Sequence, residues 1–250
     1  MTDKIALITG AGTGIGAAVA SAFLTDGWTT ILTGRRLDKL DATGASAIGA
    51  KGRAVPIACD VSKPDEVDAL FAQIEQEFGR LDLLFNNAGI GSKGAPIDEI
   101  PVQTWLDVVN VNLTGSFLCA RGAFGLMRRQ KPMGGRIINN GSISAHAPRP
   151  GSVPYTATKH AITGLTKTLA LDGRPFDIAC GQIDIGNALT EMAMPMTKGV
   201  PQANGDIAIE ATMDPKEVAH AVLHMAKLPL STNVLFMTVM ASKMPFVGRG

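Results

Sequence analysis

The stretch "LITGAGTGIGAAVASAF" at residues 7–23 decides the fold, because an apolar run ends in four closely spaced glycines and a helical pattern follows at once. Glycines allow a tight turn and let backbone amides approach a phosphate. The helix that begins there directs the positive end of its dipole at the same point. Gly12, Gly14 and Ala17 satisfy the spacing G-x-G-x-x-G/A of dinucleotide-binding turns. The turn therefore predicts cofactor contacts from Gly10, Gly12, Thr13, Gly14, Ile15 and Gly16.

Seven runs rich in Val, Ile and Leu alternate with longer helical patterns along the chain. Most of these runs lack polar alternation, which is typical of parallel strands buried on both faces. The repeated strand–helix order favours βαβ units. The sequence thus predicts an α/β fold: a single-domain, Rossmann-type, doubly wound parallel sheet of about seven strands with helices on both faces. The predicted strands cover residues 4–9, 29–33, 53–59, 81–85, 135–140, 176–183 and 233–239.

The chain has 250 residues and no linker or internal repeat, so we expect one domain spanning 1–250. The cofactor half is predicted at about 1–135, and the catalytic and substrate half at about 136–250. Within the second half, residues 184–213 are rich in methionine, proline and glycine. We interpret this segment as a mobile substrate loop or helix pair over a pocket, with flexible thioethers on its apolar side. The alternative is a surface excursion that packs on itself.

The composition excludes several classes of protein. Hydrophobic residues make up 46% and charged residues 18%, which indicates a globular chain. A net charge of +1 gives no reason to expect a nucleic-acid or membrane partner. The first residues lack a signal-peptide pattern, and no apolar stretch approaches the ~20 residues of a membrane helix. Cys59, Cys119 and Cys180 are widely spaced, so we expect no disulfide, no metal site and a cytoplasmic location.

The sequence after the second predicted strand bears on the choice between NAD and NADP. NAD-binding sites place an acidic residue there to contact the ribose 2′-hydroxyl. This chain instead has "GRR", in which Arg35 and Arg36 could bind a 2′-phosphate through charge-assisted hydrogen bonds. We therefore expect NADP (NADPH), with NAD as the alternative cofactor. The other interpretation of the two arginines is a solvated helix start.

The single tyrosine of the chain, Tyr155, lies four residues before Lys159 in "YTATK". At i and i+4 on a helix, the two side chains share a face. A free phenol has a pKa of about 10, and lowering it to ~7 requires about 4 kcal/mol of differential stabilisation. We expect the ammonium of Lys159 and an oxidised nicotinamide to supply it. The alternative is an ordinary core tyrosine beside a surface lysine.

Several motifs together resemble the short-chain dehydrogenase/reductase family over almost the whole chain. They are "TGAGTGIG" (9–16), "CDV" (59–61), "NNAG" (86–89), "NVNLTGSF" (110–117), "IINNGSIS" (137–144) and "YTATK" (155–159). The resemblance implies Asn112, Ser142, Tyr155 and Lys159 as catalytic residues. It also implies that further cofactor contacts come from Asp60, Val61, Asn86, Ala88, Gly89, Tyr155, Lys159, Gly186 and Thr190.

The resemblance implies an NADP(H)-dependent oxidoreductase that interconverts a secondary alcohol and a ketone or aldehyde by hydride transfer. Tyr155 would be the general acid/base, and Ser142 would donate to the substrate oxygen. Lys159 would hold the nicotinamide ribose and help relay the proton. Asn112, within a helical pattern that it interrupts, would help hold a water. No metal is needed.

The chain departs from the family pattern after its sixth predicted strand, in "QIDIG" (182–186). Ile185 replaces the usual proline, so the strand is expected to run one residue further. Asp184 could tune charge or contact substrate near the nicotinamide, or it could cap the following loop. His146 and Arg149 could meet an anionic substrate, or they could lie on a loop surface. By analogy with the family, the pocket should be built from residues 90–100, 143–154 and 186–213.

We expect a small-molecule carbonyl or alcohol substrate and a homo-oligomer, either a tetramer or a dimer. Many relatives assemble through the helices that would span about 102–130 and 153–171 here. Small residues in the second helix would permit close packing between subunits, or they could face the sheet: Ala157, Ala161, Gly164 and Thr168. Two other functions stay open: a catalytically silent NADP(H)-binding regulatory protein, and an epimerase or dehydratase of the extended family.

Overall fold

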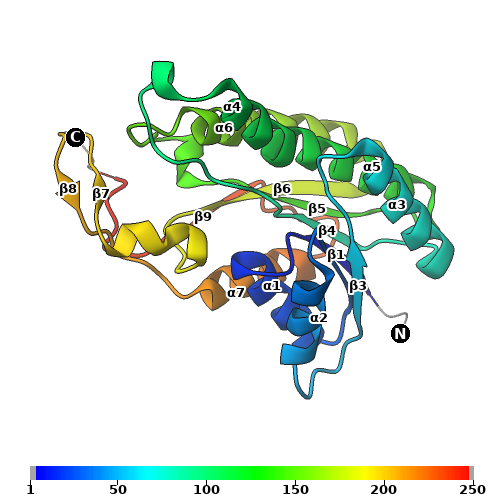
Figure 1. The fold of residues 1–250 in the computed structure, drawn as a ribbon. Coiled ribbons are helices and arrows are strands. Elements are labelled where there is room, and N and C mark those ends of the chain that lie inside the picture. The colour runs from blue at the N-terminus through cyan, green and yellow to red at the C-terminus, as the bar shows by residue number, and fades with distance from the viewer. Residues whose placement is uncertain (1–3, 248–250) are drawn as a thin grey trace.

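The computed structural model describes residues 4–247 and contains a sheet of seven parallel strands (Figure 1). Their order across the sheet is β3-β2-β1-β4-β5-β6-β9. The order reverses between β1 and β4, which is the point where ligands bind in open α/β sheets. The strands are β1 (Ile5–Thr9), β2 (Thr29–Gly34), β3 (Ala54–Ala58), β4 (Leu83–Asn86), β5 (Gly135–Asn140), β6 (Ile178–Ile185) and β9 (Phe236–Val239).

Helices cover both faces of the sheet (Figure 1). One face carries α1 (Gly14–Thr25), α2 (Leu37–Ser46) and α7 (Pro215–Lys227). The other face carries α3 (Pro64–Phe78), α4 (Val102–Val109), α5 (Gly115–Arg129) and α6 (Val153–Asp172). The predicted Rossmann-type, doubly wound fold is therefore confirmed.

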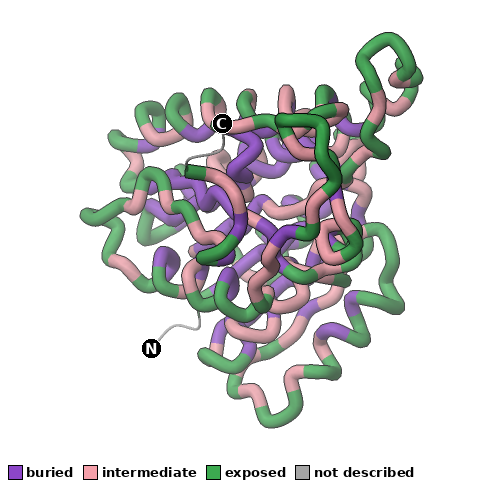
Figure 2. The backbone as a smooth tube through the Cα atoms, turned by 90° about the vertical axis from the view of Figure 1, so that its left-hand side faces the viewer, coloured by how far each residue is buried: buried purple, intermediate pink, exposed green. Residues whose placement is uncertain are grey.

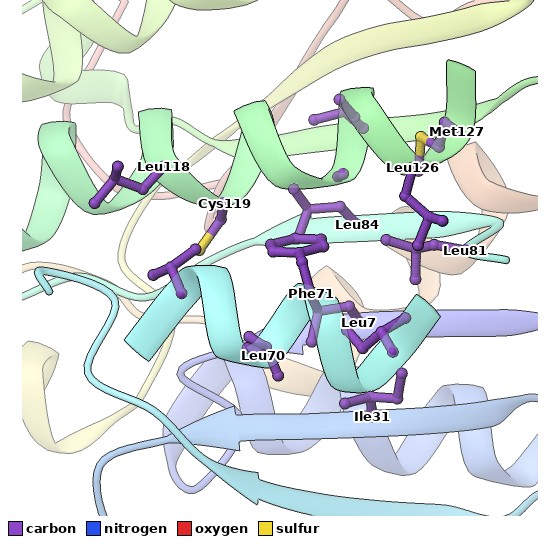
Figure 3. Packing of buried hydrophobic residues seen from close by; sticks show 14 of the residues in the cluster. Leu7, Ile31, Leu70, Phe71, Leu81, Leu84, Leu118, Cys119, Leu126 and Met127 are labelled. Atoms are coloured by element: carbon purple, nitrogen blue, oxygen red, sulfur yellow. The ribbon is translucent and has the colours of Figure 1, made fainter. Parts of the chain in front are cut away.

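The core consists of two apolar clusters, one on each face of the sheet. Neighbouring strand residues point to opposite faces, so Leu7 packs with α3 and α5 while Ile8 packs with α1 and α7. Figure 3 shows the first cluster, in which Phe71 of α3 lies beneath α5. A Cβ on Gly122 of α5 would lie 2.3 Å from the Phe71 ring, so a glycine is needed there. Figure 2 shows that the buried residues gather in the middle of the molecule and that the exposed residues lie around them.

Two irregularities occur where the sequence predicts them. Strand β6 continues to Ile185, which pairs with Val239 of β9, as expected when a proline is replaced by a residue with an N–H. A π-helical turn, Asn110–Thr114, separates α4 from α5 and contains Asn112. Such turns insert an extra residue into a helix and are frequent at functional sites.

The segment 184–213 differs from the predicted helix pair. It contains a 3₁₀-helical stretch, Glu191–Thr197, and a short antiparallel hairpin of β7 (Val200–Pro201) and β8 (Ile207–Ala208). Pro195 lies inside this stretch and has no N–H to donate, and Gly199 has a φ of 113°, so an α-helix cannot continue through this region. The mobility of the segment stays a prediction.

None of the helices within residues 4–247 is both long and apolar enough to cross a membrane. In the same range, no cluster of three or more His, Cys, Asp or Glu residues could hold a metal ion. The three cysteines are free and buried. Burial, with the nearby Glu66 and Asp60 charges, raises the pKa of Cys59 to about 11, and burial raises that of Cys180 to about 12.

Candidate active site

A cavity of about 1080 Å³ opens at the carboxyl ends of the strands, around the point where the strand order reverses. Carboxyl ends of parallel strands meet at one edge of a sheet, so residues from distant motifs gather there. The predicted site residues that line this cavity are Gly10, Gly12, Thr13, Gly14, Ile15, Gly16, Arg35, Arg36, Asp60, Val61, Ala88, Gly89, Ser142, Tyr155, Lys159, Gly186 and Thr190.

The glycine turn between β1 and α1 has a shape that suits a phosphate. Gly10 and Gly14 have φ values of 66° and 56°, in the region that favours glycine. A Cβ on Gly16 would lie only 2.1 Å from the carbonyl oxygen of Gly10, so the turn closes on itself. The side chain of Thr13 makes no capping hydrogen bond, so the first-turn amides of α1 are left for a ligand. The turn therefore fits the pyrophosphate of a dinucleotide.

Two guanidinium groups lie at the end of β2. Arg35 and Arg36 are exposed, and neither guanidinium forms a hydrogen bond or ion pair within residues 4–247, although the Arg36 carbonyl accepts from the N–H groups of Lys39 and Leu40. Burial of Asp60 acts to raise its pKa, but hydrogen bonds from Ser62 and the charge of Arg35 outweigh this and lower it. An anionic group bound here would meet two available cations.

Tyr155 and Lys159 lie one turn apart on α6. The Nζ of Lys159 is 5.5 Å from the centroid of the Tyr155 ring and donates to the backbone oxygen of Asn140 at 2.7 Å. Lys159 is buried, and burial lowers its pKa to about 8, although the negative charge of Asp184 acts in the opposite direction. The ammonium is therefore held beside the ring but does not hydrogen-bond the phenol.

In the protein without its cofactor, the phenol of Tyr155 is not made more acidic. Burial raises its pKa above the ordinary value, and a hydrogen bond with the Ser142 side chain lowers it only in part. The ammonium of Lys159 donates to the Asn140 carbonyl. The predicted lowering needs Lys159 and an oxidised nicotinamide together, so it stays a prediction. At neutral pH the phenol in the protein alone carries its proton.

Ser142 is fixed by contacts on both sides. Its backbone N–H donates to Oδ1 of Asp184 at 3.0 Å. Its Oγ accepts from the N–H of Ser144 at 3.1 Å and donates to the backbone oxygen of Ile185 at 3.5 Å. The hydroxyl and the Tyr155 phenol therefore face the cavity together.

Two predicted site residues lie outside the cavity lining, Asn86 and Asn112. The side-chain amide of Asn86 donates to the backbone oxygen of Ser116 at 2.7 Å, on the face covered by α5. The Asn112 side chain accepts from the N–H of Ile90 at 2.8 Å and donates to the Ile90 oxygen at 2.9 Å. It thus holds the backbone of the segment that lines the cavity.

Asn87 and Asn140 line the cavity but were not predicted. Asn87 donates through Nδ2 to the backbone oxygen of Thr9 at 2.9 Å and accepts from Nδ2 of Asn140 at 2.7 Å. This links the glycine turn to the residue whose carbonyl holds Lys159. A signal was available, because consecutive residues at a strand end point to opposite faces. If Asn86 faces α5, then Asn87 must face the cavity.

The loop between β5 and α6 makes two side-chain contacts that the sequence did not indicate. Arg149 forms a bidentate ion pair with the buried Glu210 and donates to Oδ1 of Asn187 at 3.2 Å. Nε2 of His146 lies 2.8 Å from Oδ2 of the buried Asp184. Arg149 lines the cavity and His146 is exposed, so a role of either in meeting an anionic substrate stays a prediction. Asp184 also does not cap the following loop, since its other partners precede it in the chain.

Glu210 has the strongest resolved shift among the carboxylates of residues 4–247. Burial acts to raise its pKa, but hydrogen bonds from Arg149, Gln202 and Asn187 outweigh burial and lower it to about 2. These partners tie the loop after β5 to both ends of the segment 187–210. Within that segment, Met192 and Met196 line the cavity as expected.

Known proteins resemble this chain in sequence and in fold. Residues 4–201 match the family model described as short chain dehydrogenase. A 3beta-hydroxysteroid dehydrogenase of Mediterraneibacter gnavus is 35% identical over 215 residues, covering 86% of this chain and 76% of that protein. Among solved structures, the 3-ketoacyl-(acyl-carrier-protein) reductase of Brucella melitensis complexed with NADH has a TM-score of 0.83 at 27% identity, covering 94% of this chain and 96% of that one.

A metagenomic short-chain oxidoreductase in complex with NADP has a TM-score of 0.80 at 27% identity, covering 96% of this chain and 97% of that one. The family match covers most of the chain, and the motifs that carry it surround one cavity. The chain therefore belongs to the short-chain dehydrogenase family and is an oxidoreductase acting on CH–OH or carbonyl groups.

Proposed function

We propose that this protein uses NADP(H) to interconvert a secondary alcohol and a ketone or aldehyde, with Tyr155 as the general acid/base. The observation that carries the proposal is that Ser142, Tyr155 and Lys159 line the same cavity as the glycine turn. A proton donor, a hydrogen-bond donor and a cation thus surround one space beside a pyrophosphate-binding turn.

The cavity residues fit the parts of the cofactor. The first-turn amides of α1 would bind the pyrophosphate, and the free guanidiniums of Arg35 and Arg36 would bind a 2′-phosphate. Lys159 would hold the nicotinamide ribose. When bound, the nicotinamide supplies or accepts the hydride. Structural relatives with NADH and with NADP both exist, so the preference for NADP depends on the two arginines.

The residues of the chain handle the proton. In the direction of reduction, the protonated phenol of Tyr155 donates its proton to the substrate oxygen, and Ser142 orients that oxygen. The raised pKa of Tyr155 suits this step, because the phenol stays protonated at neutral pH. In the direction of oxidation the phenol must first lose that proton, so alcohol oxidation should require a higher pH than ketone reduction.

A panel of ketones and alcohols with NADPH, NADH and their oxidised forms tests the proposal. Tyr155→Phe should lower kcat by about 10²–10⁴-fold while leaving NADPH binding intact. Lys159→Met should lose activity. The control is Lys167→Met, an exposed lysine two turns further along α6, and this variant should keep its activity. Full turnover by Tyr155→Phe would contradict the mechanism. Tight NADPH binding without turnover of any substrate would instead support the silent regulatory protein.

The arginines provide a separate test of cofactor choice. Arg35→Ala and Arg36→Ala should each weaken NADPH binding about tenfold and leave NADH binding unchanged, since NADH has no 2′-phosphate. Isothermal titration calorimetry measures both affinities. Equal losses for the two cofactors would contradict a role in recognising the phosphate.

We also propose that the chain forms a homo-oligomer. Exposed apolar side chains on α4 and α5, among them Trp105, Leu106 and Phe117, support this proposal. On α6, Gly164 is exposed with no atom within 4 Å of an added Cβ, so the stripe of small residues faces away from the sheet. Light scattering after size-exclusion chromatography measures the mass, and a 26.1 kDa particle would contradict the proposal.

A further inference from the structure

Asp184 is a buried carboxylate at the end of β6, directly beside the turn that carries Ser142. Its side chain is 1% exposed. Oδ1 accepts from the backbone N–H of Ser142 at 3.0 Å and from Nε2 of Gln182 at 2.7 Å. Oδ2 lies 2.8 Å from Nε2 of His146. Both carboxylate oxygens are therefore engaged, and one of them holds the backbone of a residue in the proposed catalytic set.

The turn before Ser142 packs against this carboxylate. A Cβ on Gly141 would lie 2.0 Å from Oδ1 of Asp184. The N–H of Gly141 also donates to the backbone oxygen of Ile183 on β6 at 2.8 Å. Residues 141 and 142 are thus in direct contact with Asp184 and with β6.

The charge of Asp184 also reaches Lys159. Burial lowers the pKa of this lysine, and Asp184 is the group that acts against burial. The carboxylate on β6 and the ammonium on the facing helix α6 are both buried, and the negative charge favours the charged form of the lysine. Asp184 thus affects two residues of the proposed mechanism: it accepts a hydrogen bond from the backbone of Ser142, and its charge acts on Lys159.

His146 connects Asp184 to solvent. Its side chain is 45% exposed, whereas that of Asp184 is almost fully buried. The imidazole comes from the loop between β5 and α6 and also lies edge-on to Phe246, with ring centroids 6.4 Å apart. It therefore closes the outer side of the carboxylate, opposite Ser142 and Gln182.

We propose that Asp184 is a positioning residue for the reaction: it orients Ser142 through its backbone N–H and supplies the countercharge of Lys159, while His146 holds the carboxylate in place. This inference rests on the proposed function, which gives Ser142 and Lys159 their roles. A purely structural Asp184 would stabilise the fold without affecting the ionisation of Lys159 or the pH dependence of turnover.

The first test does not depend on activity. Asp184→Asn preserves the shape and the Oδ1 acceptor but removes the charge. NMR titration of ¹³C-labelled lysines, with the Lys159 signal assigned by its loss in Lys159→Met, measures the Lys159 pKa. We expect that pKa to fall below its value of about 8 in Asp184→Asn and to stay unchanged in Asp41→Asn, an exposed match on α2. An unchanged Lys159 pKa in Asp184→Asn overturns the proposed countercharge.

The second test follows turnover with NADPH across pH. Asp184→Asn should lower kcat at least tenfold with little change in KM for NADPH, and the alkaline limb of its profile should shift to lower pH. His146→Gln, which keeps a donor, should retain most of kcat, and His146→Ala should lose several-fold. Wild-type kcat and an unshifted profile in both Asp184→Asn and His146→Ala overturn the positioning role.

The two proposals fail in different ways. If the wild type reduces no substrate, the proposed function fails, yet the lysine titration still decides whether Asp184 and Lys159 are coupled. If Asp184→Asn does not fold, Asp184→Ser removes the charge in the lysine titration, and His146→Ala, whose side chain is half exposed in the wild type, replaces Asp184→Asn in the turnover test. An unchanged Lys159 pKa in Asp184→Ser, or a wild-type kcat profile in His146→Ala, then overturns the inference.

Discussion

The two ends of the cavity are built differently. At the end near β1, backbone packs directly on backbone. A Cβ added to Gly16, for example, would lie only 2.1 Å from the carbonyl oxygen of Gly10. At the end near β6, side chains far apart in the sequence hold the walls together, such as Arg149 with Glu210 and His146 with Asp184. The first end is therefore held by close backbone contacts, whereas the second is held by polar contacts between side chains. Four predictions test this difference.

The largest effect is expected from Gly16→Ala in the glycine turn. The added methyl would overlap the Gly10 carbonyl and come within 2.7 Å of Nδ2 of Asn87, and backbone cannot move aside cheaply. NADPH affinity should fall at least a hundredfold, measured by calorimetry. Gly164→Ala on α6, far from the glycine turn in the sequence, is the control, and it should leave the NADPH affinity unchanged. Normal NADPH binding by Gly16→Ala would contradict the rigid-turn description.

The next effect is expected from Arg149→Met at the other end. It removes the Arg149 cation from its buried ion pair with Glu210, and removing one partner of such a pair typically costs about 3–5 kcal/mol. Chemical denaturation measures this loss. Substrate KM should rise more than the NADPH dissociation constant, because the pair ties the substrate segment. A double variant with Glu210→Gln should recover part of the stability, and strictly additive losses would argue against a coupled pair.

A smaller, pH-dependent effect follows from Glu210. Its folded-state pKa of about 2 lies below the ordinary value of 4.5, so its contribution to stability is present above about pH 4.5. That contribution is lost as the pH falls toward 2, and it amounts to roughly 3 kcal/mol at 1.36 kcal/mol per unit. Unfolding free energies between pH 6 and 3 should fall more steeply for the wild type than for Glu210→Gln. Equal slopes would contradict the assigned ion pair.

The smallest effect is expected from Gly91→Ala, which repeats the Gly16 substitution at the substrate end. The added Cβ would meet Cγ and Sδ of Met192 at 3.8 and 3.9 Å, which are ordinary contacts with a flexible side chain. Stability should change by less than about 0.5 kcal/mol, and NADPH affinity should stay the same. A loss comparable to that of Gly16→Ala would show that both ends are equally rigid.

The same contrast explains how much the sequence could predict. The glycine turn, the seven strands and the Tyr155–Lys159 pair follow from local spacing, and each lies where the spacing indicates. The Arg149–Glu210 and His146–Asp184 contacts join residues 61 and 38 positions apart, and no local period encodes such a pair. The position of Asn86 outside the cavity lining has a different cause. Side chains alternate along a strand, so Asn86 contacts the segment of α5 while Asn87 lines the cavity.

The contacts of Lys159 show the limit of reasoning from residue types. The spacing places an ammonium beside the Tyr155 ring, but the hydrogen bond of Lys159 goes to the Asn140 carbonyl on β5. The i, i+4 spacing gives proximity and leaves the orientation open. The orientation of Lys159 is set by Asn140 at the end of β5, and the sequence pattern of α6 holds no information about that strand.

The burial of all three thiols has a practical consequence for watching the segment over the cavity. Thiol-directed dyes react with the thiolate, and the raised pKa values of Cys59 and Cys180 keep that form scarce at pH 7. Cys119 is buried as well. A single cysteine introduced at Met194, 46% exposed on the segment, would then be the sole labelling position. Fluorescence from a dye there could follow opening and closing in real time, without first stripping the native sulfhydryls from the chain.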